Sequence, residues 1–373
     1  MAIDWAKLDA VEPRNYYEEY LASENIPINR GFAVEDLRTT EVKPWARTGV
    51  NGAFIVLDGT GGTNDAQILE IPGGKSTTPM RHMYEEFVYV LDGSGATTVW
   101  YDENKKLSFE WGKASLFAIP LNAHYQFHNG SGSQPARMLS VTDRPIVMNL
   151  FHDNNFVFNC EHQFTDRFSG EEDYFSREGK LHQKRVLSTN FIADADGLQL
   201  HEWKERGAGG RNIMFELADS TMAAHISEFP VGTYKKAHRH GPGAHVIILN
   251  GVGFSLLWPE GDDENKRKVP WKTGSMVVPP DRWFHEHFNV GSEPARYLAL
   301  RWGSARWKSG GVFSADAQLA DVSVKKGGLQ IEYEDEDPAI LKMFEEDCAK
   351  NGAKSTMREF IAQHVAERRA GNL

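Results

Sequence analysis

Histidine is the residue type that clusters in this sequence. Of its 14 histidines, six fall between His225 and His287, including a His-x-His pattern at His238 and His240. On a β-strand, residues two apart point to the same side, so this pattern presents two imidazoles to one point. A third imidazole from a distant strand can complete a ligand set that leaves positions open for a substrate. The clustering therefore predicts a catalytic metal site in the second half of the chain.

The two halves of the sequence repeat each other. Residues 74–132 can be laid over residues 232–292, and four landmark positions agree in their separation to within two residues. They are Gly74 with Gly232, His82 with His240 and Gly93 with Gly251, each 158 positions apart, and Asn129 with Asn289, 160 positions apart. A separation shared by four landmarks indicates two structural units of one kind.

Short apolar segments bounded by Gly, Pro and Asn fill both halves. Examples are FVYVL (87–91), LFAIP (116–120), HVIIL (245–249) and MVVPP (276–280). Short apolar segments separated by such turn residues are typical of the strands of a β-sandwich or barrel. Helical spacing is confined to the ends of the chain. It predicts helices over residues 16–22, 338–349 and 355–370, the last with a capped start at Ser355 and Glu359.

Both halves resemble cupin domains, small barrels with the motifs G-x5-H-x-H-x3,4-E-x6-G and G-x5-P-x-G-x2-H-x3-N. The resemblance covers residues 50–145 and 210–303. It implies an all-β bicupin with two tandem jelly-roll-like barrels, each a double-stranded β-helix, and helical extensions at the N- and C-termini. The implied parts are an N-terminal extension (1–49), a first barrel (50–150), a connector (151–209), a second barrel (210–305) and a C-terminal extension with helices (306–373).

In cupins, two histidines and a glutamate of the first motif and the histidine of the second hold one metal. In the second half, His238, His240 and His285 stand at the three histidine positions, and the resemblance implies them as metal ligands. The glutamate position falls at Ala244 or His245, so the carboxylate is missing. His245 is an alternative fourth ligand in its place.

The first half keeps only part of the same ligand set. His82 and Glu86 match the first motif, but Met80 stands at its first histidine position. In the second motif, Tyr125 replaces the histidine, and the neighbouring His124 points to the opposite face of a strand. We therefore expect a degenerate first barrel without a catalytic metal.

Further residues near the second-half motifs are candidates for catalysis and substrate recognition. The candidate catalytic residues are His287 and His245, and the candidate substrate-binding residues are Arg282, Trp283, Arg301 and Trp302. A histidine two residues after a ligand can share its face of the strand. Arginine matches carboxylate or phenolate oxygens, and tryptophan offers an apolar wall for a ring. The alternative is an ordinary role in packing or on the solvated surface.

The pattern His238-Arg239-His240, which lacks a glutamate, resembles the three-histidine bicupins that cleave the rings of gentisate, salicylate and 1-hydroxy-2-naphthoate. This resemblance implies an Fe(II) dioxygenase that cleaves a C–C bond of a hydroxylated aromatic acid or diketone with O2. A redox-neutral lyase, hydrolase or isomerase using Zn, Ni or Mn is an alternative, as is a non-catalytic cupin that binds a small molecule. Bicupins are commonly homo-oligomers, which implies a homo-oligomer here.

Composition excludes other classes of function. The chain has 41 Lys and Arg against 52 Asp and Glu, a net charge of −11 that argues against nucleic-acid binding. It has no apolar run of the length that crosses a membrane and no secretion signal, so we expect a cytoplasmic protein without a membrane partner. Cys160 and Cys348 lie too far apart in sequence to suggest a disulfide framework or a cysteine-based zinc site.

Overall fold

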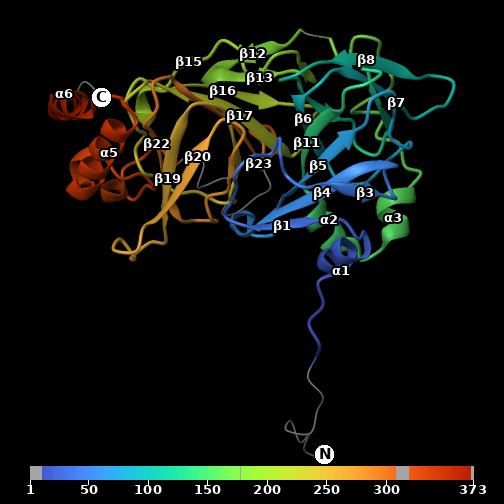
Figure 1. Cartoon of the computed structure of the whole chain (residues 1–373), viewed down its shortest axis with the longest axis horizontal. Helices are drawn as coiled ribbons and strands as arrows, with labels where there is room; N and C mark the ends of the chain where they lie inside the picture. The colour runs from blue at the N-terminus through green and yellow to red at the C-terminus, as the bar shows by residue number, and fades with distance from the viewer. Residues whose placement is uncertain (1–10, 177, 308–318, 371–373) are drawn as a thin grey trace, which may run out of the picture.

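The first half of the chain folds into a large and a small β-sheet that enclose an apolar interior (Figure 1). The structure is a computed structural model that describes residues 11–370 apart from residue 177 and residues 308–318. The large sheet has the order β1-β4-β5-β11-β6-β9-β14 with β3 beside β4, and the small sheet has the order β10-β7-β8. The strands are β1 (Ile28–Gly31), β3 (Lys43–Trp45), β4 (Val50–Leu57), β5 (Asp65–Ile71), β6 (Glu86–Asp92), β7 (Gly95–Trp100), β8 (Leu107–Trp111), β9 (Leu116–Ile119), β10 (His124–Asn129), β11 (Ala136–Thr142) and β14 (Phe191–Ile192).

The second half repeats this plan. Its large sheet has the order β12-β13-β16-β17-β23-β18-β21-β2 with β15 beside β16, and its small sheet has the order β20-β19-β22. The strands are β2 (Ala33–Val34), β12 (Lys180–His182), β13 (Val186–Ser188), β15 (His201–Glu202), β16 (Arg211–Glu216), β17 (Met222–Phe229), β18 (His245–Asn250), β19 (Val252–Trp258), β20 (Arg267–Lys272), β21 (Met276–Val277), β22 (Phe284–Asn289) and β23 (Ala295–Trp302). The prediction of two tandem all-β barrels is confirmed.

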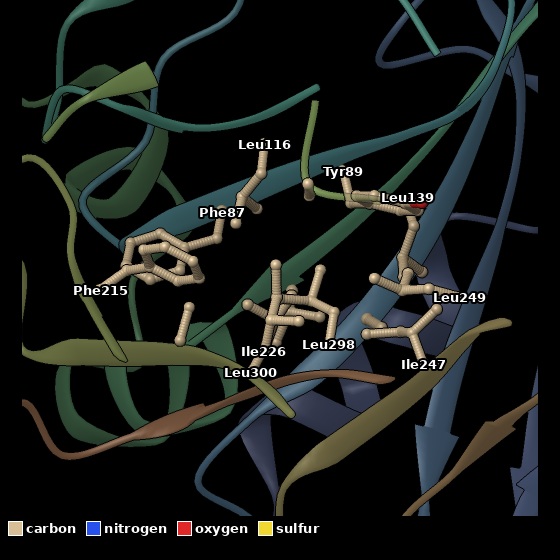
Figure 2. Packing of buried hydrophobic residues seen from close by; sticks show 14 of the residues in the cluster. Phe87, Tyr89, Leu116, Leu139, Phe215, Ile226, Ile247, Leu249, Leu298 and Leu300 are labelled. Carbon is tan, nitrogen blue, oxygen red and sulfur yellow. The ribbon is translucent and has the colours of Figure 1, made fainter. Parts of the chain in front are cut away.

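Both faces of each large sheet are buried. One face lines the interior of its own barrel, and the other packs against the other barrel in a shared apolar core (Figure 2). The first barrel contributes Phe87, Tyr89, Leu116 and Leu139, and the second contributes Phe215, Ile226, Ile247, Leu249, Leu298 and Leu300. Successive side chains of a strand alternate between the two faces, so each strand serves both cores. The barrels therefore stand back to back.

The two barrels also exchange strands. Strand β2 precedes the first barrel in sequence but pairs with β21 of the second, where Ala33 faces Val277. Strand β14 lies between β13 and β16 of the second barrel in sequence but pairs with β9 of the first, where Phe191 faces Phe117. Strand β2 falls within the predicted N-terminal extension and β14 within the predicted connector. Each of these short strands completes a sheet edge.

A buried carboxylate joins the barrels at a second place. Glu85, directly before β6, accepts hydrogen bonds from the Ser220 hydroxyl at 2.6 Å and from the Thr221 hydroxyl at 2.7 Å. The backbone N–H groups of Thr221 and Met222 donate to it at 2.9 and 3.1 Å. Arg167 adds an ion pair at 3.2 Å. Glu85 therefore fixes the turn that leads into β17.

Helices cover the outer surfaces. The α-helices are α1 (Tyr16–Ser23), α2 (Arg144–Phe151), α3 (Asn154–Asn159), α5 (Pro338–Lys350) and α6 (Met357–Arg369), and 3-10 turns include η2 (Asp58–Thr60), η3 (Gln183–Arg185), η4 (Lys204–Arg206), η5 (Val324–Lys326) and η6 (Tyr333–Asp335). The last helix begins one residue later than its predicted cap implies: Thr356 is the N-cap and makes no side-chain capping bond, while the Ser355 hydroxyl accepts from the Met357 N–H at 3.2 Å. None of the helices among the described residues is long and apolar enough to span a membrane.

Candidate metal centre

The three predicted ligands come together inside the second barrel. His285 lies on β22, and His238 lies on an extended loop that forms a single antiparallel bridge with it. On its other side the loop pairs with the C-terminal segment, since Ile331 N–H donates to the Ala237 carbonyl at 2.8 Å and Arg239 N–H donates to the Leu329 carbonyl at 3.0 Å. The His-x-His pattern is therefore held between two extended segments rather than on a regular strand.

The three imidazoles converge closely. One nitrogen from each of His238, His240 and His285 lies within 4.8 Å of the other two. The Nδ1 atoms of His238 and His285 donate to the carbonyls of Lys236 and Trp283, each at 3.2 Å. This contact leaves the Nε2 lone pair of both rings free for a ligand. The Nδ1 atom of His240 is buried without a hydrogen-bond partner in the described chain.

Burial keeps these imidazoles neutral. It lowers the pKa of His238 and His240 well below the usual value, and it lowers the pKa of His285 to about 4. The positive charge of Arg206 acts in the same direction on all three, and that of Arg301 does so on His240 and His285. A neutral imidazole is the form that binds a metal.

The donor set fits a metal ion. Three neutral nitrogens converge from rings fixed by backbone contacts, and no carboxylate joins the group among the described residues. Such a set suits Fe(II), Zn(II) or Ni(II) better than Mn(II), which prefers oxygen. His238, His240 and His285 are the residues that would hold the ion.

His287 and His245 have different surroundings. The His287 ring lies 5.7 Å from the His285 ring, and its Nδ1 is 2.8 Å from the Ser255 hydroxyl, which accepts from the Trp271 indole at 3.1 Å. His245 lies on β18 at the same parity as residues that pack between the barrels. Both of its ring nitrogens are buried without a partner in the described structure. The structure therefore brings His287 to the site and leaves His245 outside it.

The four candidate substrate-binding residues differ in whether they face the three histidines. Arg301 lies on the same face of β23 as Tyr297, and its charge lowers the pKa of His240 and His285. Trp302 has the opposite parity and packs against the core between the barrels. Trp283 packs against the interior apolar cluster of the second barrel and the Phe32 ring. Of the four, only Arg301 faces the histidines.

Arg282 has a backbone role. It stands at the glycine position of the second motif and has a φ of 61°, the left-handed region that this turn requires. Its N–H donates to the His240 carbonyl at 3.1 Å. Asn122 takes the equivalent position in the first barrel, with a φ of 55°. The Arg282 side chain is exposed, and its part in substrate binding stays a prediction.

The interior holds further charged groups that the sequence analysis missed. Arg206 of η4 is buried and pairs with Asp321 at 2.8 Å. Lys235 is buried too, and its ammonium donates to the Tyr297 hydroxyl at 3.2 Å. Burial lowers the pKa of Lys235. Burial alone would raise the pKa of Tyr297, but the charge and hydrogen bond of Lys235 outweigh it and lower that pKa.

His225 completes the polar interior. Its ring lies 5.9 Å from that of Tyr297, and burial lowers its pKa to about 3. His225 on β17 and Tyr297 and Arg301 on β23 lie on one face of the sheet, because β17 and β23 pair in a regular register. The two-residue alternation along these strands could have predicted this placement from the sequence. Arg206 lies in a connector turn with no periodic signal. The barrel interior is thus rich in cations.

The first barrel keeps the scaffold without the ligands. Met80 and Tyr125 form the same kind of antiparallel bridge as His238 and His285. The Tyr125 hydroxyl donates to Glu86 at 2.8 Å, and His82 Nε2 lies 2.9 Å from the same carboxylate oxygen. Burial would raise the pKa of Glu86, but the hydrogen bond and charge of His82 outweigh it and lower that pKa. Both contacts go to one oxygen of Glu86, and its other oxygen is buried without a hydrogen-bond partner among the described residues.

Comparisons with known proteins agree with the fold. No protein-family model and no curated protein matches the sequence. An oxalate decarboxylase from Lactobacillus farciminis, solved with formate, is 13% identical with a TM-score of 0.50, covering 84% of this chain and 96% of that chain. The Bacillus subtilis oxalate decarboxylase at pH 4.6 is 13% identical with a TM-score of 0.48, covering 81% of this chain and 86% of that chain. At this identity the likeness shows the fold alone: the chain has the two-barrel architecture of the bicupins.

Proposed function

We propose that the second barrel is a metal-dependent enzyme that cleaves a C–C bond in a small anionic substrate. The observation that supports it is the convergence of three neutral imidazoles beside Arg301. The Arg301 guanidinium has no ion-pair partner within the described ranges. A guanidinium without a counter-ion is suited to a carboxylate, which it can bind through two parallel hydrogen bonds.

The residues around the metal site would have separate roles in metal binding, substrate orientation and proton transfer. A divalent ion held by His238, His240 and His285 would supply Lewis acidity and a template for chelating oxygens. Arg301 would orient the substrate carboxylate from β23. The Lys235 and Tyr297 pair can hold or release a proton, because its two groups share a hydrogen bond and Lys235 lowers the pKa of Tyr297. The buried barrel wall limits the access of water.

Redox-neutral cleavage is the reaction class that we favour. The two-barrel fold is shared with oxalate decarboxylases, one of them solved with formate. In a decarboxylation, CO2 leaves and the electron pair of the broken bond stays on the second carbon, which takes up a proton. A phenol or ammonium of the Tyr297 and Lys235 pair is a suitable donor for that proton.

Oxygen-dependent cleavage is the second candidate. It is favoured by the ligand group itself, which consists of imidazoles without a carboxylate among the described residues. Imidazole suits iron, whereas manganese prefers oxygen ligands. An Fe(II) dioxygenase acting on a hydroxylated aromatic acid or a diketone would use the same three histidines and the same anion site at Arg301.

Metal content and oxygen demand test the proposal together. The full chain is purified without chelators or added metal, and its metals are quantified by mass spectrometry. His238→Ala removes a proposed ligand, and His82→Ala is the matched control in the first barrel. Small dicarboxylates, hydroxylated aromatic acids and diketones are then screened under nitrogen and in air, with CO2 release and O2 uptake as the readouts.

We expect about one metal per chain in the native protein and in His82→Ala, and almost none in His238→Ala. CO2 release under nitrogen would support redox-neutral cleavage. O2 uptake coupled to substrate loss would support the dioxygenase instead. A native protein without metal, or metal retained by folded His238→Ala, would overturn the proposed site.

A further inference from the structure

The first barrel contains a cavity of its own. Its volume is about 180 Å³, and it lies beside the bridge between Met80 and Tyr125, the counterpart of the bridge between His238 and His285. An apolar cavity of about 150 Å³ is large enough to hold benzene. The cavity walls include the rings of Trp45 and Phe158. The space can therefore hold a small organic molecule.

This cavity is not a second metal site. Met80 and Tyr125 stand where the second barrel has imidazoles, and thioether and phenol groups do not replace two of them. His82 donates through Nδ1 to the Tyr84 carbonyl at 2.7 Å, and its Nε2 faces Glu86 at 2.9 Å. The two remaining residues of the motif are thus bound to protein oxygens.

Two polar groups in the cavity wall lack a partner. The Gln67 side-chain oxygen accepts from Arg144 at 2.7 Å, which fixes the amide so that its NH2 group is the free end. That NH2 group and the Tyr84 hydroxyl make no hydrogen bond to any residue in the described part of the chain. Each of the two side chains is 4% exposed. Neither donor is among the fully buried atoms without a partner, which fits donors that open onto the cavity, and two such donors in one cavity suit a ligand with acceptor oxygens.

The charge of the wall identifies the kind of acceptor. Arg47 and Arg81 line the cavity, and no described Asp or Glu does. Arg47 forms an ion pair with Glu24. Arg81 donates to the Asn159 carbonyl at 2.7 Å and has no carboxylate partner among the residues described. The wall therefore carries an uncompensated positive charge, which favours an anion.

We propose that this cavity is a metal-free binding site for a small monocarboxylate with an apolar body. The carboxylate accepts from the Tyr84 hydroxyl and the Gln67 amide, and the apolar body lies against Trp45 and Phe158. The site is separate from the metal centre, because it lies in the interior of the other barrel. Its occupancy does not depend on a metal.

Calorimetric titration with benzoate tests the site, and benzamide is the neutral probe of the same shape. Tyr84→Phe removes the proposed donor and keeps the ring, and Met80→Trp fills the cavity. Tyr174→Phe is the control, because its hydroxyl is a buried phenol without a hydrogen bond among the described residues and lies outside this cavity. His238→Ala separates this site from the metal centre. Circular dichroism confirms that each variant is folded.

We expect one benzoate per chain in the native protein, in Tyr174→Phe and in His238→Ala. Tyr84→Phe should weaken binding by about tenfold or more, the usual effect of losing a hydrogen bond to a charged group. Met80→Trp should abolish binding, and benzamide should bind at least about tenfold more weakly than benzoate. If Met80→Trp does not fold, a crystal soaked in benzoate provides the same test of location.

Four results would overturn the proposal. They are no binding of benzoate, equal binding of benzamide, unchanged binding in Tyr84→Phe, and loss of binding in folded His238→Ala. The last would assign the benzoate to the metal centre. None of these results depends on catalytic activity, so the experiment tests the first-barrel site independently of the proposed metal site.

Discussion

His238 and His285 exchange two backbone hydrogen bonds, of 3.1 and 2.9 Å, and their rings lie 4.2 Å apart. Met80 and Tyr125 exchange the same two bonds in the first barrel, at 2.9 and 2.8 Å. The backbone that positions the imidazoles is therefore present twice. The barrels differ at this point in their side chains and not in their scaffold.

Restoring the missing side chains should create a second metal site. We expect the double variant Met80→His and Tyr125→His, with the native His82 and Glu86, to raise the metal content from about one to about two per chain. The control is Met80→Leu with Tyr125→Phe, which changes the same positions without adding ligands. Mass spectrometry of the purified proteins measures the result, and unchanged stoichiometry would show that the scaffolds are not equivalent.

Replacing Arg301 should separate activity from stability. Arg301→Met removes a cation that has no ion pair in the described chain, so the unfolding temperature should stay the same or rise. The kcat/KM for the substrate found in the screen should fall by about a hundredfold or more, because the anion loses its guanidinium. Arg211→Met on the exposed side of β16 is the control and should change neither quantity. A fall in stability without a change in kcat/KM would give Arg301 a structural role.

Asp143 should make stability depend on pH. Burial, then the charge of Glu85, raises the pKa of this carboxyl well above its usual value. The folded protein therefore keeps a proton that the unfolded chain releases above about pH 4, and the free energy of unfolding falls as the pH rises through that interval.

Asp143→Asn removes this proton and should flatten the dependence. Its amide oxygen can still accept from the Glu85 N–H, which donates to Asp143 at 2.7 Å in the native chain. We expect the variant to gain about 1 to 3 °C in unfolding temperature relative to the native protein between about pH 5 and pH 8. Asp166→Asn, on the exposed surface, is the control for the loss of one carboxylate. Parallel curves for the native protein and Asp143→Asn would contradict the assignment.

Glu85 should be essential for joining the barrels. Glu85→Ala leaves the hydroxyls and N–H groups of Ser220, Thr221 and Met222 without their acceptor, which should cost about 3 kcal/mol or more in the free energy of unfolding. Glu85→Gln keeps one acceptor oxygen and should cost less. Chemical denaturation measures both, with Glu172→Gln as the exposed control. Equal stability of Glu85→Ala and the native protein would mean that water replaces the carboxylate.

Much of the architecture could be predicted because the repeat carries it. The matched glycines, His82 with His240, and Asn129 with Asn289 indicated two barrels, which the structure shows. The same alignment brought out the replacement of two histidines by Met80 and Tyr125. Local patterns also predicted that helix α5 begins at Pro338, because a proline at the start of an amphipathic segment favours the first position of a helix.

Other features depend on contacts that leave no local pattern. Strands β2 and β14 have two residues each, too short for any periodicity. Arg206 reaches the histidines from a connector turn. His245 could not be placed on one face of β18 from sequence, because both faces of that strand are buried and apolar residues occupy both. Long-range packing decided each of these cases.

The exchange of β2 and β14 also limits how this duplicated chain can be divided. A cut before β12, which keeps β12 and β13 with the second barrel, leaves the second barrel without the edge strand supplied by residues 33–34 and the first without the one supplied by residues 191–192. Neither fragment then has a complete sheet, and each exposes an unpaired edge open to association with other chains. The two copies have become mutually dependent, so evolution can modify one copy's chemistry freely but can no longer lose or transfer that copy as an independent module.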